Sequence, residues 1–130
     1  MTAQDYKNNG YKISLHIDQA EIDAKEDLAF KCYVLPIIPT ADREDENVRN
    51  VIMAITFVML AQGYIFATRA GGKQKNTAQS STPNDFAILN EGASRALAYL
   101  EILSTQEGAV AKPNVIDVAH LYFKTQFFYI

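Results

Sequence analysis

Hydrophobic residues between positions 19 and 35 recur at the three- and four-residue spacing of an α-helix. Asp18, just ahead of them, offers a side-chain oxygen to the first free amides of a helix, and Pro36 cannot continue one. One face of this helix is expected to hold the apolar residues Ile22, Ala29 and Tyr33, and Glu26 is the exception because it is a charged residue on that face. We therefore predict a first helix over residues 19–35, followed at 36–39 by an extended elbow that its two prolines stiffen.

A second helix is predicted from Val48 onward, where apolar residues cover nearly every side. Four acids precede it, and negative charge is favourable at the amino end of a helix. These acids are Asp42, Glu44, Asp45 and Glu46. They lack the glycine turn and the alternating oxygen ligands of a calcium loop, so we interpret them as a helix start and not as a metal site. This second helix is expected at the centre of the fold.

A third helix is predicted over residues 85–103, with a clear start and end. Thr82 suits the N-cap position and Pro83 the first helical position, while Gly108 and Pro113 close the run. Its apolar stripe, at three- and four-residue spacing, comprises Phe86, Leu89, Ala93, Ala96, Leu97, Leu100 and Leu103.

The amino-terminal part of the chain lacks this helical spacing. Residues 1–10 are polar and predict an arm, and residues 11–17 alternate in the manner of a half-buried strand or extended segment. The alternating apolar residues are Tyr11, Ile13, Leu15 and Ile17. We therefore predict one mainly α domain over residues 1–130, a small bundle of three or four helices with a projecting loop or β-hairpin and an extended C-terminal tail.

The predicted projection is the segment 69–81, which contains no large apolar residue. Such a stretch between two helices is typical of a long exposed loop or a projecting hairpin. It is also the most basic part of the chain, which leaves open a contact with phosphate or an acidic partner. The residues that give it this character are Arg69, Gly71, Gly72, Lys73 and Lys75.

The predicted tail, residues 115–130, has no clean period and finishes in large apolar side chains. Apolar groups of this size are costly to expose, so either the same domain or a neighbouring chain must cover them. Chain ends are usually polar and frayed, so a large apolar end is unusual. We predict that the tail docks on a partner chain, which would cover these side chains. The residues expected to bind that partner are Phe123, Phe127, Phe128, Tyr129 and Ile130.

Composition excludes several classes of protein. A chain of 130 residues with 48% apolar and 21% charged residues fits one globular domain, and its net charge of −3 lacks the basic footprint of a protein that wraps DNA. The start of the chain has no apolar signal core, and the apolar run at 51–68 is interrupted too often for a membrane span. Cys32 is the single cysteine and cannot form an internal disulfide, so we expect a reducing compartment.

No catalytic constellation is visible in the sequence. The two histidines, His16 and His120, have no nucleophile or orienting acid in view. These two histidines and the single cysteine also lack the paired ligand spacing of a zinc site. We interpret Cys32 as a small buried apolar residue. The Gly-Gly-Lys sequence at 71–73 lacks the upstream glycine and the following Ser or Thr of a phosphate-binding loop. We expect no enzymatic activity, no cofactor and no metal.

Several features occur in a particular order along residues 13–104. They are the Tyr-Val-Leu-Pro exit of the first helix at 33–36, the Leu-Ala-Gln-Gly-Tyr end of the second at 60–64, the polar projection at 69–81 and the third helix with Ala-Tyr-Leu at 98–100. This order resembles that of the small head-to-tail connector, or adaptor, proteins of tailed bacteriophages. No single motif in it is diagnostic.

The resemblance implies a structural virion protein, made in the host cytoplasm and located at the head–tail junction. Proteins of that family form a ring, so a dodecameric homo-oligomer beneath the portal protein is expected, in contact with further neck or tail proteins. The segment 69–81 would then project toward a neighbour or the lumen, where non-specific contact with DNA is conceivable, and the tail would reach the portal. The tail is longer and more aromatic than the family's pattern, which leaves its direction open.

Two other classes of function stay open. A small non-enzymatic inhibitor or immunity-type protein, acting by protein–protein binding as a monomer or dimer, would share the acidic charge and the single domain. An enzyme whose site is built from scattered polar residues, such as Glu101, Asp117 and His120, would need perturbed acids in a pocket.

Overall fold

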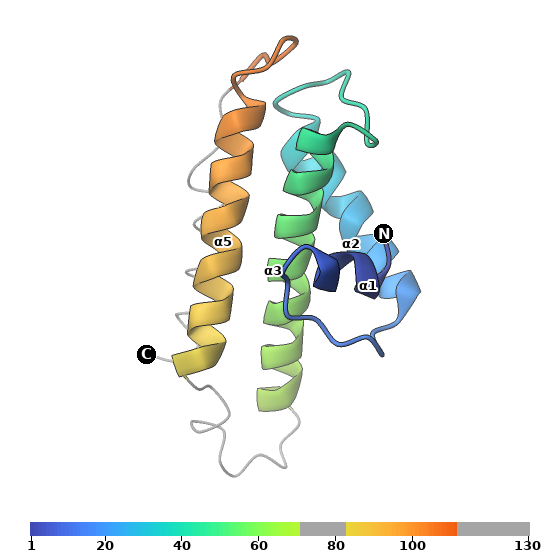
Figure 1. Ribbon diagram of the computed structural model, residues 1–130, viewed down its shortest axis with the longest axis vertical. Helices are drawn as coiled ribbons and strands as arrows, with labels where there is room; N and C mark the ends of the chain where they lie inside the picture. The colour runs from blue at the N-terminus through green and yellow to red at the C-terminus, as the bar shows by residue number, and fades with distance from the viewer. Residues whose placement is uncertain (71–82, 112–130) are drawn as a thin grey trace.

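The computed structural model has a long central helix with another helix on either side (Figure 1). It describes the backbone of residues 1–70 and 83–111 and the side chains of residues 1–61 and 87–111. The elements are α1 (Ala3–Asn8), α2 (Gln19–Ala29) with its π-helical continuation η1 (Phe30–Val34), α3 (Glu46–Ala70) and α5 (Pro83–Leu103). The predicted fold class, a mainly α-helical bundle, is confirmed.

Helix α3 is the centre of the bundle. It packs against α2 on one side and runs antiparallel to α5 on the other (Figure 1). Every residue from 51 to 58 is buried, as expected for a helix that is apolar nearly all round. No helix in the described part of the chain is long and apolar enough to cross a membrane.

Helix α5 lies against α3 through a single stripe. Leu89, Ala96 and Leu100 are buried on it, as predicted, and the helix begins at Pro83. Gly92 stands at a close approach of the two helices, because a Cβ atom there would lie 2.9 Å from side-chain atoms of both Phe57 and Val58. A residue without a side chain is therefore required by the packing at this position.

Helix α2 begins as predicted, since the Asp18 carboxylate accepts a hydrogen bond from the Ala20 amide at 3.1 Å. Its last turn widens in η1, where the Leu35 amide donates to the Phe30 carbonyl at 3.0 Å. The helix ends before Pro36, which has no amide hydrogen to donate.

The extended elbow predicted at 36–39 is wrong. The amides of Ile37 and Ile38 both donate to the Val34 carbonyl at 2.9 Å, which makes this segment a turn. Both isoleucines are buried by it, and that burial outweighs the preference of the flanking prolines for an extended chain. Residues after α5 meet the same turn, since the Val110 amide donates to the Ile37 carbonyl at 2.8 Å.

The polar arm predicted at 1–10 is also wrong, because this segment forms α1. Thr2 and Asp5 make a reciprocal capping box, in which each side chain accepts a hydrogen bond from the other's backbone amide, at 3.2 and 2.8 Å. The helix buries Ala3 and Tyr6, and the Tyr6 side chain is fully enclosed. The capping box and the burial of these two side chains fix a helix whose other residues are mostly polar.

The strand or extended segment predicted at 11–17 is not a strand. Its amides make short-range bonds, from Ile13 to the Tyr11 carbonyl and from Ile17 to the Ser14 carbonyl, so the chain turns. Tyr11 is buried and Ile13 and Ile17 are partly buried, in keeping with the alternation. The described residues offer no neighbouring strand, and a strand needs one to pair its amides and carbonyls.

Candidate functional site

Most residues nominated from the sequence lie outside the described part of the chain. This holds for the tail residues Phe123, Phe127, Phe128, Tyr129 and Ile130, for the loop residues Gly71, Gly72, Lys73 and Lys75, and for Asp117 and His120. Arg69 is different. It was placed in the projecting loop, but α3 continues to Ala70, so Arg69 belongs to the helix.

Cys32 and His16 do lie in the described part. Cys32 was interpreted as buried, but it is exposed on η1. Position 32 follows Leu28 by one helical turn, and Leu28 itself points away from the core. His16 is exposed in the turn after α1, and Glu101 is exposed on α5. Among the described residues, no group of three or more His, Cys, Asp or Glu could hold a metal ion.

A buried polar cluster ties α1 to α2. The Glu26 carboxylate accepts a hydrogen bond from the Tyr6 hydroxyl at 2.6 Å and from the Met1 amino group at 2.9 Å. Glu26 is 5% exposed, so its charge is paired away from water. Burial, with the bond to Glu26 as a second cause, raises the pKa of Tyr6 far above that of a free tyrosine. This cluster joins α1 to α2, and two of its members, Met1 and Glu26, also line a groove at the start of α3.

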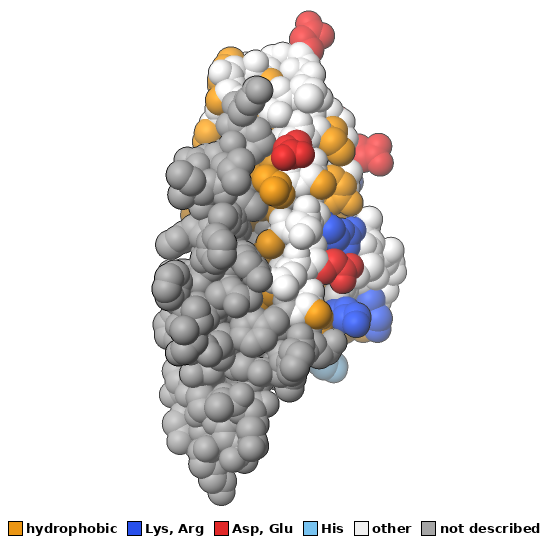
Figure 2. All heavy atoms as spheres, turned by 90° about the vertical axis from the view of Figure 1, so that its left-hand side faces the viewer, with side chains coloured by type: hydrophobic (Ala, Val, Ile, Leu, Met, Phe, Trp, Pro, Cys, Tyr) orange, Lys and Arg blue, Asp and Glu red, His pale blue; other side chains and the backbone are white. Residues whose placement is uncertain are grey.

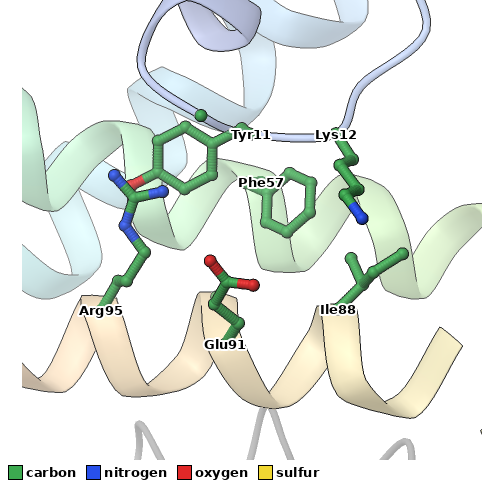
Figure 3. Close-up of a pocket in the computed structure, with 8 residues that line it drawn as sticks. Tyr11, Lys12, Phe57, Ile88, Glu91 and Arg95 are labelled. Atoms are coloured by element: carbon green, nitrogen blue, oxygen red, sulfur yellow. The ribbon is translucent and has the colours of Figure 1, made fainter. Parts of the chain in front are cut away.

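A second cluster joins the segment after α1 to α5 (Figure 3). The Arg95 guanidinium lies 3.9 Å from the ring centroid of Tyr11 and donates to the Asn9 carbonyl at 3.0 Å. The Tyr11 ring in turn lies 5.1 Å from that of Phe57 on α3. Glu91 lines the same pocket from α5, one helical turn before Arg95.

The pocket between these residues has a volume of about 10 Å³, roughly the space that one water molecule needs. It is therefore too small for an organic substrate. The Tyr11 hydroxyl is buried without a hydrogen-bond partner in the protein. Burial raises the pKa of Tyr11 to about 12, against the opposing effect of the Arg95 charge.

Replacing Tyr11 with phenylalanine is expected to stabilise the protein by about 1 kcal/mol, because it removes a buried hydroxyl with no partner and keeps the ring contacts. In the parent, the folded state raises the pKa of the Tyr11 hydroxyl and therefore favours its neutral form. This contribution to the free energy of unfolding is fully present below pH 10 and is lost as the pH rises toward 12. Urea unfolding at pH 8 and pH 11 tests both points. A variant that is less stable at pH 8, or equally sensitive to pH 11, would contradict them.

Two open grooves meet at the start of α3, with volumes of about 280 and 210 Å³. The larger is lined by both signs of charge, from the acids Asp5, Glu26 and Glu44 and the cations Arg43 and Arg49. Glu44 and Arg49 also line the smaller one. Both signs of charge line this surface, so its composition does not select an anion or a cation.

The described surface also carries large hydrophobic side chains. Leu28 on α2 is 45% exposed and Ile102 on α5 is 49% exposed, while Leu15 and Val110 lie in the segments that precede α2 and follow α5. The sequence predicted the inward stripes of these two helices, but their exposed outward apolar residues were not predicted. A signal was present on α2, where Ala24, Leu28 and Cys32 follow one another at four-residue intervals.

No family model, curated protein or solved structure matches this chain. The described residues carry two structural clusters, one mixed-charge surface and four exposed large hydrophobic side chains, two of which, Leu28 and Ile102, lie on the helices that flank α3.

Proposed function

We propose that this protein is a structural virion protein, a ring-forming adaptor that joins the portal of a tailed bacteriophage to its tail or neck. The proposal is supported by the order of the helices, which is the order on which the resemblance to connector proteins rests. It is carried by one observation, that both helices flanking α3 keep a large apolar side chain exposed, Leu28 at 45% and Ile102 at 49%.

Exposed apolar side chains on two sides suit a protein that works by contact with other chains. A large hydrophobic group left in water contributes nothing to the stability of the lone subunit, but it contributes when a neighbour covers it. A subunit in the middle of an assembly needs at least two such surfaces, one for each neighbour. A monomeric inhibitor needs only one, so this feature favours the adaptor over a monomeric inhibitor, whereas a dimeric inhibitor would also use two.

The partners in this proposal are further copies of the chain, the portal protein and the next neck or tail protein. The C-terminal residues Phe123 and Phe127–Ile130 are proposed to meet the portal, on the strength of their apolar character alone. The basic side chains of Arg69, Lys73 and Lys75 are proposed to face a neighbour or the DNA in the lumen.

The proposal is tested by the mass of the purified protein, alone and mixed with the portal protein of the same phage. We expect a complex with several copies per portal ring, seen by analytical ultracentrifugation and as a ring by electron microscopy. A second form truncated after Tyr122 should keep the circular dichroism of the full chain and lose portal binding. A full-length protein that stays monomeric with the portal present would refute the adaptor function.

A further inference from the structure

Residues 1–13 lie across the bundle as an arm, called here the strap. The strap comprises α1 and the turn after it, and its contacts reach from Glu26 on α2 to Arg95 on α5. It joins the start of α2 through residues 14–16, all of which are exposed. The strap is therefore attached to the bundle at one end through a connection that lies in solvent.

Every hydrogen bond between the strap and the bundle involves a side chain. Among the described residues, no backbone hydrogen bond joins the strap to α2, α3 or α5. Its own amides bond within it, from Tyr6 to the Thr2 carbonyl at 3.2 Å and from Tyr11 to the Tyr6 carbonyl at 3.0 Å. Of its residues, only Ala3, Tyr6 and Tyr11 are buried. The strap can therefore leave without breaking a backbone hydrogen bond of the helices beneath it.

The first anchor of the strap is on α2. The Glu26 carboxylate accepts hydrogen bonds from the Tyr6 hydroxyl at 2.6 Å and from the Met1 amino group at 2.9 Å, and Gln19 donates to the Met1 carbonyl at 2.8 Å. If Met1 alone left, Glu26 would stay buried without its counterion, which is costly. If Met1 and Tyr6 leave together, the carboxylate returns to water. These two contacts are therefore expected to break as a pair.

The second anchor is Arg95 on α5. Its guanidinium donates to the Asn9 carbonyl at 3.0 Å and lies 3.9 Å from the centroid of the Tyr11 ring. One side chain thus holds two positions of the strap, so both are released together. Arg95 is only partly buried, and in the view from the α5 side basic side chains lie along one edge of the described surface (Figure 2). Water can therefore solvate the guanidinium once the strap has left.

The closed position of the strap carries a cost that opening removes. The Tyr11 hydroxyl is buried there without a hydrogen-bond partner in the protein. Water hydrates this hydroxyl when the strap opens, which lowers the free energy of opening. Helix α1 has six residues, far fewer than a helix needs to be stable alone in water. The strap therefore depends on its two anchors and on its three buried side chains.

We propose that the strap is a lid on the central helix, which opens as one unit while α2, α3 and α5 stay packed. Helix α5 lies on α3 through Leu89, Ala96 and Leu100, which belong to the bundle itself. Opening uncovers α3 at Phe57, whose ring lies 5.1 Å from that of Tyr11 in the closed form. This conformational device does not depend on the adaptor function, so either proposal can fail without the other.

Native-state hydrogen exchange at low concentrations of urea tests the proposal, because each amide reports the free energy of the opening that exposes it. The amides of Tyr6, Asn9 and Tyr11 are hydrogen-bonded within the strap. We expect these three amides to share one free energy of opening and one dependence on urea. Both values should be smaller than those of the amides of residues 51–58 on α3, which exchange only when the whole bundle unfolds and more surface is exposed.

Two variants at the second anchor should move the opening in opposite directions. Arg95→Met keeps an apolar stem but removes the guanidinium, so the strap amides should exchange at least about tenfold faster. Tyr11→Phe removes the unpartnered hydroxyl, and its expected gain of about 1 kcal/mol should slow the strap amides about fivefold.

Two further variants are controls outside the strap. Arg43→Met removes contacts of the same kind, because Arg43 lies 4.9 Å from the centroid of the Phe30 ring and donates to Asp27 at 3.2 Å. Leu103→Ala opens a cavity in the core at the end of α5 and should speed the amides of residues 51–58 at least about thirtyfold. Both variants should leave the strap amides within about twofold of the parent, because the strap opens without disturbing these contacts.

Any of three outcomes would overturn the proposal. The first is equal free energies and urea dependences for the strap amides and for residues 51–58, or an equal acceleration of both by Leu103→Ala, since the strap would then open only on global unfolding. The second is unrelated values among the strap amides without urea dependence, which would mean local fraying of α1. The third is an effect of Arg95→Met on the strap amides no larger than that of Arg43→Met.

Discussion

Replacing Glu26 with alanine is expected to lower the free energy of unfolding by about 3–5 kcal/mol, the usual effect of removing one partner from a buried ion pair. Glu26 is 5% exposed and accepts hydrogen bonds from the Tyr6 hydroxyl and the Met1 amino group. Without the carboxylate, the tyrosine hydroxyl loses its acceptor, and the charged amino group of Met1, a residue whose side chain is only 12% exposed, loses its counterion. Chemical unfolding in urea, followed by circular dichroism, measures the loss.

Two variants serve as controls for this prediction. Glu26→Gln keeps the shape and an acceptor for Tyr6 but not the charge, so its loss should fall between those of the parent and Glu26→Ala. Glu21→Ala removes an exposed acid from the first turn of the same helix and should cost less than about 1 kcal/mol. If Glu26→Ala cost no more than Glu21→Ala, the buried cluster would not hold α1 to the bundle.

Replacing Gly92 with valine is expected to destabilise the protein by about 3 kcal/mol through overpacking. A Cβ atom at this position would already lie 2.9 Å from Phe57 Cδ2 and from Val58 Cγ2, and valine adds two methyl groups to it. Both neighbours are buried, so they have little room to move. The midpoint of thermal unfolding should fall accordingly.

The comparison variant for Gly92 is Ala98→Val, on the exposed side of the same helix. It introduces the same β-branched residue at an exposed position, and it should lower stability by less than about 1 kcal/mol. Valine has a better helix propensity than glycine and a worse one than alanine, so propensity alone would make Gly92→Val the milder of the two variants. Equal effects would mean that α3 and α5 are not in tight contact at Gly92.

The sequence determined the main helices well, because their signals are local. The spacing of apolar residues predicted α3 and α5. Asp18 marked the start of α2, Pro83 the start of α5 and Pro36 the end of the first helix, each through the geometry of its own or adjacent residues. The central place of α3 could also be predicted, since a helix that is apolar on all sides has to be covered on all sides. The predictions from local signals were wrong for the turn at 36–39 and for α1, where packing against other parts of the chain decides the conformation.

Only the tertiary structure decided which polar residues meet. Tyr6 and Glu26 are 20 positions apart, and Asn9 and Arg95 are 86 apart, so neither pair leaves a pattern that a helical or strand period can detect. The outward face of α2 shows the same limit. Its four-residue spacing was visible in the sequence, but α2 has apolar residues on both sides, and only the packing of the bundle placed Ile22 and Ala29 in the core. Leu28 and Cys32 stayed in solvent because a helix at the outside of a bundle buries only the side that faces its neighbours.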